Sequence, residues 1–149
     1  MNKLLHIRNA RVPEQRAQME DLQRRKVCAF CRKHFEENHK NPILFENQDW
    51  LLAKNDYPYE GTRVHLLLVH KRHVEDMANV TSRALYNLAP VLRWAKKRFR
   101  IKGSTFLMRS GDMRYNGATV SQLHAHIIVG VREGKGTEPI KRKLGFKKK

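Results

Sequence analysis

Residues 121–130 form the stretch SQLHAHIIVG, in which Gln122, His124 and His126 occupy every second position. Side chains of an extended strand alternate between its two faces, so these three polar side chains share one face. The apolar residues between them point the other way and can pack on a core. Three interpretations fit this pattern: a metal site, a phosphate-handling site, or a polar sheet face without chemistry, since histidine is common at half-exposed sheet positions.

The overall composition is that of a globular protein. The chain has 149 residues, of which 40% are hydrophobic and 30% are charged. This length fits one domain with a proper core. No apolar run approaches the roughly 20 residues that a membrane-spanning helix needs, and the first 15 residues contain no apolar stretch of signal-peptide length. We therefore expect a cytoplasmic protein with no membrane partner.

The charge of the chain is strongly positive. Lysine and arginine total 31 against 14 acidic residues, so the formal net charge is +17. Such an excess favours an anionic partner: a nucleotide, a nucleic acid or an acidic surface. Part of the excess lies in EPIKRKLGFKKK, residues 138–149, which also fits a simple solubilising tail.

Helical and extended segments alternate along the chain. Residues 13–38 are rich in helix formers and predict one or two helices, interrupted near Cys28. The clearest buried strand is VHLLLVH, residues 64–70. Further strands are predicted at residues 42–47, 49–55, 104–110 and 119–131.

The main helix is predicted over residues 79–101, where apolar residues recur at helical spacing. Thr81 or Ser82 is a suitable N-cap, and Pro90 predicts either a kink or a later start. The order of the elements suits an antiparallel sheet with this helix packed on one face. The predicted fold class is therefore α+β.

The only two cysteines, Cys28 and Cys31, form a CxxC pair in the segment CAFC. A disulfide-stapled fold needs more cysteines at wider spacings. In a cytosolic protein this spacing indicates a metal or redox site, and the alternative is a reduced, buried pair without a metal.

The loop SGDMRYNGATV, residues 110–120, precedes the histidine strand. Its Gly111 and Gly117 allow backbone N–H groups to approach a phosphate. The same composition occurs in ordinary hairpin connections, so the loop alone is a weak signal.

Several segments, in the expected order, resemble the histidine triad (HIT) family. GATVSQLHAHIIVG, residues 117–130, is similar to its signature, in which three histidines alternate with apolar residues and an apolar pair follows. CAFC resembles the CxxC of many bacterial members. NDYPYEGTRVHLLLVHKRHVEDM, residues 55–77, resembles the family's nucleoside-binding segment and the strand after it. The YPY in it is similar to the dinucleoside polyphosphate hydrolase or phosphorylase-type branch.

The resemblance runs from about Cys28 to Val131 and implies an α+β HIT-like fold. It divides the chain into an N-terminal helical extension (1–27), a HIT-like domain (28–134) and a basic C-terminal tail (135–149). It also implies a homodimer and a nucleotide-binding hydrolase or nucleotidyltransferase. Such an enzyme acts at an α-phosphate through a nucleotidyl-histidine intermediate, with a dinucleoside polyphosphate or a nucleoside phosphoramidate as substrate.

The catalytic positions of the family fall on the histidine strand. The middle histidine, the family's nucleophile, corresponds to His124, and the third, which contacts the phosphate, corresponds to His126. The first position is Gln122, which can hydrogen-bond but cannot titrate near pH 7. Because the nucleophile is retained, we expect an active enzyme in which these three residues form the catalytic group.

The resemblance also assigns positions for the nucleoside and the leaving group. The ribose-binding position falls on Asn55, and Leu52 and Ile43 are expected in the base pocket. Arg109 or Arg114 is expected to bind a polyphosphate.

The attacked phosphate is expected to lie against the loop before the histidine strand. The Gly117 N–H and the backbone of Ala118 and Thr119 would hold its oxygens together with His126, and the Thr119 hydroxyl would add a further hydrogen bond.

Zinc-bearing members of the family hold their metal with the CxxC pair, a histidine after the Lys/Arg step and the first triad histidine. Here these positions are occupied by Cys28, Cys31, His73 and Gln122. Glutamine is a poor zinc ligand, and His34 or His70 is a candidate replacement. We expect a structural zinc ion.

Two other functions remain open. A nucleic-acid-binding module would use the basic surface, with bases stacked on Trp50, Tyr57, Tyr59 and Tyr115. A HIT-like binding protein without catalytic activity is the second, because Gln122 replaces a histidine.

Overall fold

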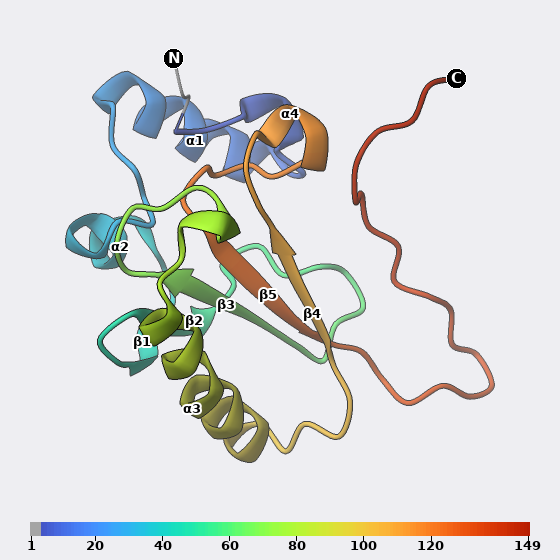
Figure 1. The fold of residues 1–149 in the computed structure, drawn as a ribbon. Coiled ribbons are helices and arrows are strands. Elements are labelled where there is room, and N and C mark those ends of the chain that lie inside the picture. Colours follow the sequence, from blue (N-terminus) through green and yellow to red (C-terminus); the bar gives the residue numbers. More distant parts are fainter. Residues whose placement is uncertain (1–3) are drawn as a thin grey trace.

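The centre of the molecule is a five-stranded antiparallel sheet in the order β1-β2-β3-β5-β4 (Figure 1). The computed structural model describes residues 4–149. The strands are β1 (Ile43–Glu46), β2 (Trp50–Lys54), β3 (Val64–His70), β4 (Thr105–Arg109) and β5 (His124–Val129). Since β5 lies between β3 and β4, the strand that bears the histidines is paired on both sides.

Helices precede the first strand and also lie between later strands in the chain. The α-helices are α1 (Pro13–Arg25), α2 (Arg32–Asn38), α3 (Ser82–Arg98) and α4 (Met113–Asn116), and the short 3-10 turns are η1 (Ile7–Asn9) and η2 (Met77–Asn79). The break between α1 and α2 lies at the CAFC segment, as predicted. The α+β fold with a helix packed on an antiparallel sheet is confirmed. No helix in residues 4–149 is long and apolar enough to cross a membrane.

The main helix, α3, is capped by Thr81, whose side-chain oxygen accepts a hydrogen bond from the Ala84 N–H. The helix continues through Pro90 to Arg98, so the later start is wrong. A proline inside a helix removes one backbone hydrogen bond. This loss is tolerated because α3 packs against β1 and β2 and buries side chains such as Val91 on them.

The sheet is buried on both faces, and residues of β2 and β3 alternate between them. On the α3 face, Trp50, Leu52, Leu66 and Leu68 pack with Ala125 and Ile127 of β5. On the other face, Leu51, Ala53, Leu67 and Val69 pack with Phe35 of α2. Burial on both faces explains why VHLLLVH is nearly continuous in its apolar residues. His124 and His126 belong to the second face.

The N-terminal segment packs beside the start of the histidine strand. Leu5 forms a β-bridge with Val120, and the side chains of Met19 and Leu22 from α1 pack in the same cluster. The segment predicted as an N-terminal extension therefore packs against the residues that lead into β5.

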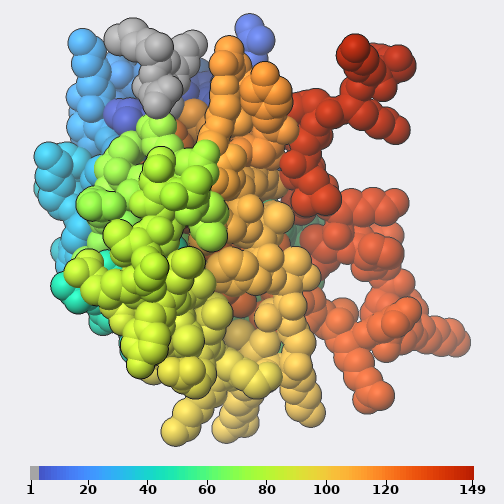
Figure 2. Space-filling view, viewed as in Figure 1, coloured from blue at the N-terminus to red at the C-terminus, as the bar shows by residue number. Residues whose placement is uncertain are grey.

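The C-terminal tail leaves the end of β5 and turns back along the β4 side towards α4 (Figures 1 and 2). It has no helix or strand between residues 130 and 149. It is attached to the sheet by the Arg109 side chain, whose Nη2 donates to the Lys143 carbonyl at 2.6 Å.

Candidate active site

Strand pairing places four residues around the two triad histidines. His126 lies opposite Leu67 of β3 and Leu107 of β4, and His124 lies opposite Val69 and Arg109. Both histidine side chains are buried. The pairing therefore brings an arginine next to His124 on the sheet face that α3 does not cover.

The backbone fixes the tautomer of His124. Its Nδ1 lies 2.8 Å from the Gln122 carbonyl oxygen. Because a carbonyl can only accept, Nδ1 carries the proton and Nε2 presents a lone pair. Burial, followed by the nearby Arg109, lowers the pKa of His124 to about 4, although the Gln122 carbonyl acts in the opposite direction. His124 is therefore neutral at pH 7, with its proton on Nδ1 and a lone pair on Nε2.

The tautomer of His126 is set by a second histidine that sequence reasoning missed. The Tyr59 N–H donates to His65 Nδ1 at 2.9 Å, so the proton of His65 is on Nε2. That Nε2 lies 2.8 Å from His126 Nδ1, which must accept. His126 therefore carries its own proton on Nε2. The alternation of VHLLLVH places His65 on the same face as Leu67, and this spacing is the sequence signal that could have identified it.

Burial keeps this pair neutral. It lowers the pKa of His65 to about 4, with smaller effects from Arg11 and Arg142. It also lowers the pKa of His126 well below its usual value, with further contributions from neighbouring histidines and arginines. Since neither ring is charged at pH 7, the N–H of His126 is a neutral hydrogen-bond donor.

A cavity of about 220 Å³ adjoins the two histidines. Its polar lining includes His124, His126, Asn55, Arg109, Gly117 and Thr119. Its apolar lining comprises Leu5, Met19, Leu22, Ala29, Phe30, Leu67 and Val120. Asn55, Arg109, Gly117 and Thr119 are thus brought together as predicted. The apolar wall comes largely from α1 and the CAFC segment, which were not predicted to contribute.

Three side chains that were predicted to bind the nucleotide lie outside the cavity lining. Leu52 is fully buried on the α3 face of the sheet, so its assignment to the base pocket is wrong. Arg114 forms a two-pronged ion pair with Asp112 and does not line the cavity. Ile43 packs beside Phe35 and also lies outside the cavity lining.

The loop before β5 offers fewer free donors than expected. The Gly117 N–H donates to the Met113 carbonyl at 3.2 Å, and the Ala118 N–H donates to Asn116 Oδ1 at 2.9 Å. These hydrogen bonds close the short helix α4, and they occupy two of the N–H groups that were expected to hold a phosphate. Among the loop groups assigned to phosphate binding, the Thr119 side chain remains available at the cavity.

Gln122 faces a different site. Its amide nitrogen donates to the carbonyls of Phe30 at 3.0 Å and His70 at 2.7 Å, and its oxygen lies 3.1 Å from Cys28 Sγ. The side chain is fully buried and is absent from the cavity lining. The prediction that Gln122 belongs to the catalytic group is therefore not supported by its position.

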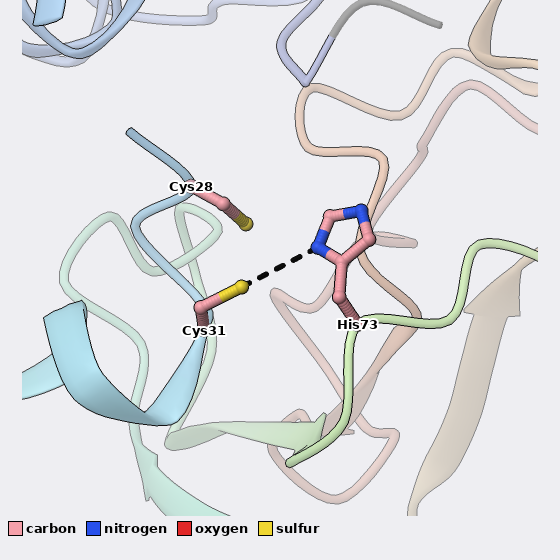
Figure 3. A group of neighbouring side chains, drawn as sticks. All are labelled: Cys28, Cys31 and His73. Carbon is pink, nitrogen blue, oxygen red and sulfur yellow. Dashed lines mark hydrogen bonds between the residues drawn. The ribbon is translucent and has the colours of Figure 1, made fainter. Parts of the chain in front are cut away.

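Cys28, Cys31 and His73 form a compact group, with one potential ligand atom from each residue within 4.8 Å of the others (Figure 3). Cys31 Sγ lies 3.4 Å from His73 Nδ1. His73 Nε2 lies 3.2 Å from Glu75 Oε1, and a carboxylate on the second ring nitrogen is typical of metal-binding histidines. These residues fit a zinc ion.

The amide oxygen of Gln122 borders the same group, 3.2 Å from His73 Nδ1. The two thiol protons can satisfy the two acceptors, Cys28 towards Gln122 and Cys31 towards His73. One divalent cation would replace these two protons without a change of charge. His34 and His70 do not belong to the group, and His70 Nδ1 instead lies 2.8 Å from the Arg72 carbonyl.

The buried histidines predict how stability depends on pH. In the folded chain the pKa of His65 and of His124 is about 4, whereas an unfolded histidine titrates near 6.5. Between these values the unfolded chain binds more protons, so stability falls as pH falls. The expected slope is on the order of 1 kcal/mol per pH unit for each histidine. Urea unfolding between pH 6.5 and 5 measures it.

The matched variants are His65→Asn and His124→Asn, which each remove one buried imidazole. Each should show a shallower dependence than the parent between pH 6.5 and 5, a window above the range in which most carboxylates titrate. An unchanged slope in both variants would contradict the neutral, buried state of these rings.

Residues 36–133 match the HIT domain family. Solved structures with the same fold include a HIT family hydrolase from Clostridium thermocellum, at 22% identity and a TM-score of 0.56, over 68% of this chain and 90% of that one. A histidine triad nucleotide-binding protein from Candida albicans has 19% identity and a TM-score of 0.57, over 76% and 87%. Curated protein sequences gave no significant match.

A hypothetical histidine triad nucleotide-binding protein from Sulfolobus tokodaii covers a similar range, with 21% identity and a TM-score of 0.56 over 81% of this chain and 82% of that one. At these identities the structures establish a shared fold. The sequence match spans most of the chain and includes β1 to β5 with both triad histidines. The chain therefore belongs to the histidine triad (HIT) family.

Proposed function

We propose that this protein is a nucleotidyl hydrolase or transferase in which His124 Nε2 attacks the α-phosphorus of a bound nucleotide. The observation that carries the proposal is the hydrogen bond from His124 Nδ1–H to the Gln122 carbonyl, because it leaves Nε2 unprotonated beside the cavity. A neutral imidazole is an effective nucleophile at pH 7.

The reaction has two steps. In the first, the Nε2–P bond forms, the bond from phosphorus to the leaving group breaks, and the leaving group takes the electron pair. In the second, water or another acceptor attacks phosphorus, the Nε2–P bond breaks, and the nucleotide is released. His126, with its proton on Nε2, donates to a phosphate oxygen in both steps.

The same cavity accommodates the nucleoside. The apolar wall with Met19, Leu22 and Phe30 would take the base, and Asn55 would bind the sugar hydroxyls. The Asn55 side chain is already oriented, because its oxygen accepts from the Tyr57 N–H at 2.8 Å. Dinucleoside polyphosphates and nucleoside phosphoramidates both supply the required α-phosphate.

Replacement of His124 by Ala tests the proposal directly. The nucleotidyl adduct, trapped by acid or denaturant quench and detected by mass spectrometry, should be absent in His124→Ala. It should still form in His126→Ala at a rate about a hundredfold lower, because one donor to the reacting phosphate is lost.

His34→Ala is the control, since His34 lies outside the cavity lining. It should form the adduct at the parent rate with an adenosine phosphoramidate or a diadenosine polyphosphate. An adduct formed by His124→Ala would show that another residue is the nucleophile. No adduct with the parent protein, despite nucleotide binding, would favour a binding protein without activity.

We also propose a structural zinc ion held by Cys28, Cys31 and His73, with the Gln122 oxygen beside it. When bound, zinc would tie the CAFC segment to the start of the histidine strand. It would contribute to folding without entering the phosphate chemistry.

Elemental analysis of protein purified without added metal should find about one zinc per chain. Cys31→Ser should lose the metal, and His34→Ala should keep it. Gln122→His should bind zinc more tightly, because imidazole is a better zinc ligand than an amide oxygen. A zinc content near zero in the parent protein would refute the site.

We further propose that the protein is a homodimer. α3 exposes 47% of Leu85 and 81% of Tyr86, and the edge strand β4 exposes 43% of Phe106. Apolar exposure on a helix and on an unpaired strand edge favours pairing with a second copy.

Light scattering at micromolar concentration should give twice the chain mass of 17.6 kDa. Tyr86→Glu should shift this species towards the monomer, because a charge would be buried at the interface. Tyr115→Glu should not, although Tyr115 is exposed to a similar degree. A parent protein that scatters as a monomer would exclude the dimer.

A further inference from the structure

Three arginines from three separate segments line the cavity beside the triad histidines. Arg11 lies between η1 and α1, Arg109 ends β4, and Arg142 lies in the C-terminal tail. Arg11 and Arg142 fall outside residues 36–133, the range that matches the family. Two of the three charges are therefore supplied by segments that precede and follow the shared domain.

The guanidinium groups are held in place by specific contacts. Arg11 Nη2 donates to the Tyr57 carbonyl at 2.6 Å. The guanidinium carbons of Arg11 and Arg142 lie 4.5 and 4.1 Å from the centroid of the Tyr59 ring. Two cations on one aromatic ring concentrate positive charge at one point of the cavity.

The C-terminal tail contacts the domain beside the same cavity. The Lys143 carbonyl accepts from Arg109, and the Lys143 side chain lies against Gly117, where an added Cβ would come within 2.8 Å of it. Gly117 has a φ of +76°, which glycine adopts without strain. This close approach allows the tail to reach the rim of the cavity and place Arg142 there.

No carboxylate in the described part of the chain neutralises the positive charge of this cluster. In residues 4–149, none of the three arginines forms an ion pair with a carboxylate. The acidic group of the described lining, Asp56, accepts hydrogen bonds from the backbone of Lys40 and Asn41 instead.

Two further observations favour an anionic ligand at this cluster. Arg109 Nε is buried and has no hydrogen-bond partner in the described residues. The pKa of Arg11 is lowered by desolvation and by the charges of Arg142 and Arg109, an effect that the Tyr59 hydroxyl opposes. A buried donor without a partner and repulsion among like charges are both unfavourable, and an anion in the cavity would relieve both.

We propose that Arg11, Arg109 and Arg142 form a binding site for consecutive phosphate groups next to the phosphate at His124. The inference rests on the proposed function and selects among its substrates. One α-phosphate at the neutral histidines does not need three further cations, whereas a polyphosphate chain carries about one charge per additional phosphate. Guanidinium groups bind such oxygens through paired hydrogen bonds. A polyphosphate leaving group is therefore favoured over an uncharged amine.

Inorganic tripolyphosphate is the probe, with AMP as the reference ligand, and calorimetry measures both. Arg142→Gln and Arg11→Gln should each weaken tripolyphosphate binding by about tenfold, as expected for loss of one charge-assisted contact. AMP binding should change by less than about threefold, since the α-phosphate lies at the histidines. Lys147→Gln removes the same charge from the tail outside the cavity and should leave both affinities unchanged.

Limited trypsin digestion provides a second measurement. Tripolyphosphate should protect the peptide bonds after Arg142 and Lys143, and it should leave the bond after Lys147 accessible. Protection that does not depend on Arg11 would contradict the proposal, because the site requires both terminal segments.

The outcomes separate this inference from the proposed function. In one outcome, the histidine adduct forms and AMP binds, but Lys147→Gln weakens tripolyphosphate binding as much as Arg142→Gln does. The three-arginine site is then refuted, and tripolyphosphate binds only through the general positive charge of the protein. If no adduct forms in the parent protein, the proposed function fails, and tripolyphosphate binding still tests the site. Single-stranded oligonucleotide, added at the same concentration of phosphate groups, provides the last comparison. If it displaces tripolyphosphate and its own binding depends steeply on salt, the surface binds nucleic acid and the proposal is overturned.

Discussion

The register of β5 is the constraint on which the site depends. Because β5 is paired with β3 and β4, its backbone cannot shift without breaking two ladders of hydrogen bonds. Ala125 and Ile127 pack in the core beneath α3, which sends His124 and His126 to the opposite face. A shift of one residue would place both imidazoles in the apolar core. The packing that stabilises the sheet thus also positions His124 and His126 at the cavity.

Hydrogen bonds then give two chemically identical side chains different roles. A backbone carbonyl, which can only accept, places the proton of His124 on Nδ1 and leaves a lone pair at Nε2. The backbone N–H of Tyr59, acting through His65, has the opposite effect on His126 and places its proton on Nε2. Burial keeps both rings neutral. The neighbours of the two rings therefore determine their tautomers, and under the proposed function this difference makes His124 the nucleophile and His126 the hydrogen-bond donor.

Features determined by local spacing could be predicted from the sequence. The alternation of QLHAH predicted that His124 and His126 share a face, and the CxxC spacing indicated a metal or redox site. The resemblance to zinc-bearing HIT members added His73, and the structure brings it together with the two cysteines. The incorrect assignment of Leu52 to the base pocket also has a local cause. Successive residues of β2 point to opposite faces of the sheet, and Leu52 is on the face that α3 covers. His65 was missed because its role appears only when β3 pairs with β5.

The contributions of the two terminal segments could not be predicted, because no local pattern links them to the cavity. Arg11 and Arg142 are 131 positions apart, and they meet on the ring of Tyr59 only after α1 and the tail have packed beside β5. This arrangement also separates the charge of the cavity from the packing of the sheet. Residues on the sheet are constrained by two cores, so a change there costs stability. Arg11 and Arg142 lie outside both cores of the sheet, so they add positive charge to the cavity without taking part in the packing that holds the histidine strand.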